Sequence, residues 1–90
     1  MKNEWEAVKE NTNYALDKDR IVNIWFDYVD CIGIVYTDKT NQKDLGRKQI
    51  DFDAGDFTLK NVNKEIQDFA KENNIDLPEM NEENLSTAIN

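Results

Sequence analysis

Histidine is absent from this sequence of 90 residues, cysteine and proline occur once each, and glycine occurs three times. The single cysteine, Cys31, excludes an internal disulfide, which fits a reducing compartment. Without histidine it also lacks the usual base of a thiol nucleophile, so we expect a small, mostly buried residue there. The scattered glycines exclude a glycine-rich phosphate-binding loop.

Long apolar runs and positive charge are also scarce. The longest apolar run, Ile32 to Tyr36, is far shorter than the roughly 20 residues of a membrane-spanning helix, and residues 1–6 contain no signal-peptide-like run. Lysine and arginine total 11 against 19 acidic residues, a net charge of −8. This balance argues against direct binding to nucleic acid or anionic membranes. We expect a cytoplasmic domain without a cofactor. Its negative charge would steer it toward basic proteins. The alternative is that the charge serves solubility alone.

Two stretches have apolar residues at helical spacing. The positions i, i+3, i+7, i+10 and i+11 hold Trp5, Val8, Thr12, Ala15 and Leu16 in the first stretch, and Leu59, Val62, Ile66, Phe69 and Ala70 in the second. Each set places one apolar stripe along one face of a helix. Asp56 or Thr58 is expected to cap the second helix, and Asn73 with Asn74 to end it.

Three segments between these stretches alternate as strands do. Their even-numbered residues are the more apolar set: Val22, Ile24, Phe26, Ile32, Ile34, Tyr36, Lys48, Ile50 and Phe52. Because side chains alternate across a sheet, this set should face the core beneath the helices. A loop over residues 28–30 would pair Asp27 with Cys31 and Trp25 with Gly33. The polar segment 38–46 is expected to be a loop, with its basic residues in solvent.

The predicted fold class is α+β, with one small domain over residues 1–75. A three-stranded antiparallel sheet is flanked by an N-terminal and a C-terminal helix, in the order α-β-β-β-α. Residues 76–90 are expected to form an acidic C-terminal tail, either a short extra helix or a frayed end. Because this tail has few apolar positions, its removal should leave a folded domain. The expected core comprises Val22, Ile24, Phe26, Ile32, Ile34, Ile50, Phe52, Leu59, Val62, Ile66 and Phe69.

Asp51, Asp53 and Asp56 form the acidic cluster most like a site. Gly55 and Val62 stand where an EF-hand loop needs oxygen ligands, so that calcium motif does not fit. Asp51 and Asp53 are instead expected on the polar face of the third strand, with Asp56 at the helix cap.

Trp25 falls on the odd-numbered sheet face with Asp27, Asp51 and Asp53. Tryptophan is enriched among residues that dominate interface affinity, and a partner's cation can stack on the ring while pairing with a carboxylate. Alternatively, the ring covers Gly33 across the strand pair, or a dimer partner buries it. The candidate partner-binding residues are Trp25, Asp27, Asp51, Asp53 and Asp56, with Glu79, Glu82 and Glu83 in the tail.

These features predict a small acidic binding protein, not an enzyme, that occludes a basic surface on a nuclease or another nucleic-acid-binding protein. Same-face neighbours in a strand are about 6.6 Å apart, comparable to neighbouring phosphates, so Asp51 and Asp53 would stand in for phosphates. DNA mimics, inhibitors, immunity proteins and phage anti-defence proteins generally act in this way. Two alternatives remain open: a structural or adaptor subunit that forms a homodimer, and a metal-dependent enzyme that uses Asp51, Asp53 and Asp56.

Overall fold

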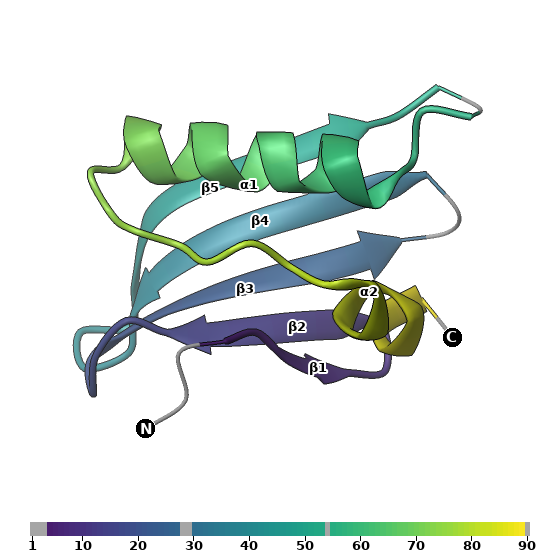
Figure 1. Ribbon diagram of the computed structural model, residues 1–90. Coiled ribbons are helices and arrows are strands. Elements are labelled where there is room, and N and C mark those ends of the chain that lie inside the picture. Colours follow the sequence, from purple (N-terminus) through teal and green to yellow (C-terminus); the bar gives the residue numbers. More distant parts are fainter. Residues whose placement is uncertain (1–3, 28–29, 54, 90) are drawn as a thin grey trace.

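The computed structural model describes residues 4–27, 30–53 and 55–89. The strands are β1 (Glu6–Val8), β2 (Asn11–Ala15), β3 (Arg20–Asp27), β4 (Cys31–Asp38) and β5 (Lys43–Asp51), and the helices are α1 (Leu59–Glu72) and α2 (Glu82–Ile89). The strands form one antiparallel sheet in chain order. Both helices lie on the same face of this sheet, α1 along β4 and β5 and α2 over β1 and β2 (Figure 1). Neither helix of this described part is long and apolar enough to cross a membrane.

The predicted N-terminal helix is wrong, because its residues form the β1–β2 hairpin. The sheet therefore has five strands instead of three, and both helices follow it in the chain. Lys9 and Glu10 make the turn between Val8 and Asn11, with Glu10 at a positive φ of 69°. Such tight turns favour glycine or asparagine, and neither occurs at these two positions, so the sequence carries no turn signal. The low helix propensity of the asparagines agrees with the strand.

The predicted alternation is confirmed in β3 and β4. Asp27 pairs with Cys31 and Trp25 with Gly33, in the expected register. The even-numbered apolar residues of both strands are buried: Val22, Ile24, Phe26, Ile32, Ile34 and Tyr36. Val35 is the exception to the alternation, since this odd-numbered residue of β4 is buried as well. Residues 28 and 29 of the expected loop lie outside the described residues. The expected loop over 38–46 is too long, since β5 already begins at Lys43 with an irregularity opposite Tyr36 and Thr37.

The predicted second helix is confirmed as α1. Thr58, not Asp56, is its N-cap, and the Thr58 hydroxyl accepts a hydrogen bond from the Asn61 N–H at 3.2 Å. Asn73 is the C-cap. The predicted core residues of the helix and sheet are buried together, except that Ile50, Phe52 and Leu59 are only partly buried at its margin.

The segment after α1 packs into the core, and of the two alternatives expected for residues 76–90 the short extra helix is the one that forms. Leu77, Met80, Leu85 and Ala88 are buried, and a helix forms over Glu82–Ile89; residue 90 is outside the described part. The Trp5 indole N–H donates to the Pro78 carbonyl at 2.7 Å, and the Asn84 amide donates to the Trp5 carbonyl at 3.0 Å. Trp5 thus belongs to the core, as predicted, but it does not lie in a helix. These contacts hold the two ends of the described chain together.

Thr12, on β2, carries a buried hydroxyl that has no hydrogen-bond partner among the described residues. An unsatisfied buried hydroxyl costs about 1–3 kcal/mol, and valine has nearly the same shape without it. Thr12→Val should therefore raise the free energy of unfolding by about 1 kcal/mol, measured by urea denaturation. Thr12→Ser keeps the hydroxyl and loses the methyl group, so it should lower stability. A destabilised Thr12→Val protein would show that the hydroxyl is hydrogen-bonded after all.

Candidate functional site

The sheet face opposite the helices, called here the open face, carries three of the predicted site residues. Strand register places Trp25 between Asn11 and Gly33 in one cross-strand row. The next row places Cys31 between Asp27 and Asp51. Trp25 is 44% exposed, whereas Trp5 is 2% exposed. The structure therefore brings Trp25, Asp27 and Asp51 together on one accessible surface.

The Trp25 side chain lies against β4 and meets a side chain of β5. Its indole lies over Gly33, where an added Cβ would be 3.1 Å from Trp25 Cε3. The Arg47 guanidinium carbon lies over the ring, 5.9 Å from its centroid, and Arg47 also pairs with Asp44 at 3.1 Å. The ring thus covers the glycine, as one alternative reading expected, and it also accepts a guanidinium while much of its surface stays exposed.

Five exposed carboxylates gather where β3 meets β4 and where β5 ends. We call this group the acidic end: Glu10, Asp27, Asp30, Asp51 and Asp53. The Phe26 N–H donates to the Glu10 carbonyl at 3.0 Å and the Phe52 N–H to the Asp30 carbonyl at 2.7 Å, which brings their segments to this edge. Within the described ranges, none of the five carboxylates forms an ion pair. Their negative charge is therefore not neutralised by a contacting cation.

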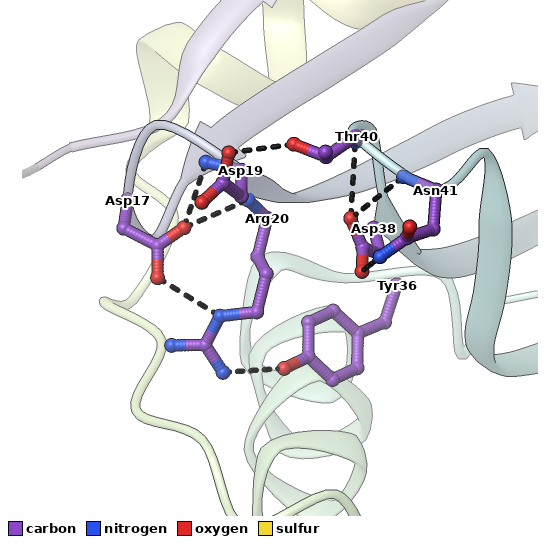
Figure 2. A network of polar contacts seen from close by, with 7 residues as sticks. All are labelled: Asp17, Asp19, Arg20, Tyr36, Asp38, Thr40 and Asn41. Carbon is purple, nitrogen blue, oxygen red and sulfur yellow. Dashed lines mark hydrogen bonds and ion pairs between the residues drawn. The ribbon is translucent and has the colours of Figure 1, made fainter.

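Carboxylates at the opposite end of the sheet are used inside the protein. Asp17 accepts hydrogen bonds from the Asp19 and Arg20 N–H groups at 2.9 and 2.8 Å and pairs with the Arg20 side chain at 2.9 Å (Figure 2). These bonds, led by the one from the Asp19 N–H, hold the pKa of Asp17 below its ordinary value. Hydrogen bonds from Asn41 lower the pKa of Asp38 in the same way. This polar network fixes two turns of the sheet.

A surface cavity of about 620 Å³ lies beside Trp25 on the open face. Its volume is within the range of about 300–1,000 Å³ that is usual for small-ligand sites. Asn11 is one of its lining residues, and the buried Oδ1 of Asn11 accepts no hydrogen bond from the described part of the chain. Lys9 is the one basic residue among the described lining residues, which are Lys9, Glu10, Asn11, Trp25, Phe26, Asp27, Cys31, Gly33 and Gln49. The cavity therefore combines an aromatic wall with hydrogen-bond acceptors.

Cys31, on the cavity wall, is partly buried and bonded on both sides. A hydrogen bond to the Asp51 carboxylate, followed by burial, raises the pKa of the Cys31 thiol. The Gln49 amide donates to the sulfur at 3.5 Å and acts in the opposite direction. Because the thiolate is the reactive form, a raised pKa makes this thiol a poor nucleophile at neutral pH.

Asp51→Asn is expected to speed the alkylation of Cys31. Removing the carboxylate removes the group that most strongly favours the protonated thiol, so the pKa of Cys31 should fall and the thiolate fraction at a given pH should rise. The measurement is the rate of iodoacetamide reaction against pH, with Asp53→Asn as the control of equal charge change. Identical profiles for Asp51→Asn and the parent would contradict the contact.

The remaining predicted site residues lie off the open face. Asp53, the last member of the acidic end, was predicted on the polar face of the third strand but follows β5, which ends at Asp51. Asp53 and Asp56 are in the connection between β5 and α1, where the Asp56 N–H donates to the Asp53 carbonyl at 2.9 Å. Glu79 lines a cavity beside α1, and Glu82 and Glu83 begin α2. These three glutamates are on the helix-covered side, away from Trp25. No group of three or more potential metal-ligating side chains occurs among residues 4–27, 30–53 and 55–89.

Glu10, Asn11 and Asp30 belong to the site but were not predicted from the sequence. Glu10 and Asn11 reach the open face through the hairpin, and the sequence carried no signal for its turn. No protein-family model, curated protein or solved structure matches this sequence.

Proposed function

We propose that this chain is a small, acidic, non-enzymatic binding protein that covers a basic surface on a protein partner. The partner surface would be of the type that binds nucleic acid, as in a nuclease, so the chain would act as an inhibitor. The observation that carries the proposal is the acidic end, whose carboxylates have no ion-pair partner among the described residues and lie beside an exposed tryptophan.

Charge supports a basic partner in particular. The net charge is −8, and the acids of the opposite sheet end are occupied by the turn network. The acidic end presents five exposed carboxylates that pair with no described cation. Complementary charge raises association rates and suppresses wrong partners. Lysines and arginines that normally contact phosphates are the groups that would pair with these carboxylates.

The side chains of the open face favour binding over catalysis. The Cys31 thiol has a raised pKa, and the sequence contains no histidine to activate it. Asp51, Asp53 and Asp56, the residues of the metal-enzyme alternative, do not form a convergent ligand set. Trp25 instead offers a large, rigid surface of the kind that dominates protein interfaces.

The test begins with capture of the partner from the native host on immobilised protein, at low and at high salt. Parent protein should retain a basic protein that the Asp27→Asn/Asp51→Asn variant retains poorly. The matched control is Asp76→Asn/Glu79→Gln, which removes the same charge from the helix side. Each variant is first checked for an unchanged urea unfolding transition.

Three results would overturn the proposal. One is equal capture by the Asp27→Asn/Asp51→Asn variant and the parent. Another is a greater loss in the Asp76→Asn/Glu79→Gln control, which would move the contact surface to the glutamates of the helix side. The third is a parent protein that sediments as a homodimer and whose open-face amides are protected from hydrogen exchange. That result would favour the adaptor alternative.

A further inference from the structure

We propose that the cavity beside Trp25 is a binding site for the guanidinium group of a partner's arginine. This inference rests on the proposed function, and it specifies which side chain of the basic partner the open face receives. The cavity of about 620 Å³ is large enough for one such side chain. Its walls provide two kinds of contact that a guanidinium uses, namely an aromatic ring and carboxylates.

The aromatic contact comes from Trp25. Its indole packs over Gly33 and remains 44% exposed beside the cavity. A guanidinium is planar and weakly hydrated, and it stacks on aromatic faces more readily than an ammonium group. Arg47 of the same chain already lies over this ring, with its guanidinium carbon 5.9 Å from the centroid. The indole is thus placed so that a guanidinium can reach it.

The acceptors come from the turn before β2 and from β3. Glu10 and Asp27 bring exposed carboxylates to the cavity, and neither forms an ion pair with a described residue. A guanidinium has five N–H donors in a fixed plane, so it can serve both carboxylates at once. Asn11 also lines the cavity and provides a reporter amide beside them.

The lining also argues against an anionic or apolar ligand. Lys9 is the one cation of the described lining, opposed by the carboxylates of Glu10 and Asp27. The Cys31 thiol is engaged by Asp51 and Gln49, so it offers no free charge to the cavity. An anion would be repelled by these two carboxylates, with Lys9 as the one described counter-charge, and an apolar group would leave both carboxylates without a partner. A planar cation pairs with the carboxylates and stacks on the ring.

The experiment is an NMR titration of the ¹⁵N-labelled full chain with N-acetyl-arginine amide. The Trp25 indole N–H and the Asn11 side-chain amide should shift together, with a dissociation constant on the order of 1 mM. The Trp5 indole N–H, bonded to Pro78, should not move and serves as the internal control. N-acetyl-lysine amide and the uncharged N-acetyl-citrulline amide should both bind distinctly more weakly.

Asp27→Asn should weaken the binding of N-acetyl-arginine amide about fivefold, whereas Asp76→Asn, of equal charge change but outside the cavity, should leave it unchanged. Equal affinity for the arginine and lysine compounds, an unmoved Trp25 signal, or parent-like binding by Asp27→Asn would each overturn the inference. If the arginine compound fails to bind while the captured partner still depends on Asp27 and Asp51, this site is wrong and the proposed function stands. If the arginine compound binds and no basic partner is captured, the site stands and the proposed function is wrong.

Discussion

A chain that ends at Ile75 is expected to lose its cooperative unfolding transition. Deletion of residues 76–90 removes Leu77, Met80 and Leu85 from the buried cluster and takes the Pro78 carbonyl from the Trp5 indole. Burial of one large apolar side chain contributes about 1.5–3 kcal/mol, so three of them approach the whole stability of a small domain, about 5–15 kcal/mol. Urea unfolding followed by tryptophan fluorescence and circular dichroism measures the effect.

Two point variants of the full chain test the same packing without shortening it. Leu85→Ala, at a buried position of α2, should lower the free energy of unfolding by about 2–5 kcal/mol. Ile89→Ala, on the exposed side of the same helix, should change it by about 0.5 kcal/mol or less. A truncated chain that still unfolds in one cooperative step, or equal effects of the two variants, would contradict this role of α2.

Phe69→Ala is expected to cost about 3–5 kcal/mol of unfolding free energy. Phe69 lies on the buried face of α1, is 1% exposed, and is the largest fully buried side chain described. Its truncation leaves a cavity between the helix and the sheet that the surrounding strands cannot close. Phe57→Ala, at a partly buried margin position, is the control and should cost clearly less. A Phe69→Ala protein as stable as the parent would exclude Phe69 from the packed core.

The middle of the fold was predictable because its side chains alternate without ambiguity. The apolar residues at 22, 24 and 26 and at 32, 34 and 36 allow one orientation of β3 and β4, because a shift by one residue would expose all of them. The stripe of α1 is equally clear, and Thr58 and Asn73 mark its ends. The alternation of β3 also predicts Trp25 and Asp27 on one face, and that of the third predicted strand places Asp51 with them, as the register shows.

The two ends of the chain were not predictable from local pattern. The β1–β2 hairpin has a turn without glycine or asparagine, and Thr12 occupies a core position where an apolar residue would have marked the strand. Leu77 and Met80 fill the core from an extended segment, where single buried side chains produce no periodicity. Glu10 and Asn11 of the cavity depend on the same hairpin, so that part of the site needed the structure.

The central claim, that the open face binds a basic partner, is tested most directly by calorimetric titration of the captured partner at two salt concentrations. For the parent, affinity should fall steeply as salt rises, because the carboxylates of the acidic end attract the partner. Asp27→Asn/Asp51→Asn should bind more weakly with a shallower salt dependence, and Asp76→Asn/Glu79→Gln should match the parent. Equal affinity and equal salt dependence for all three folded proteins would contradict the claim.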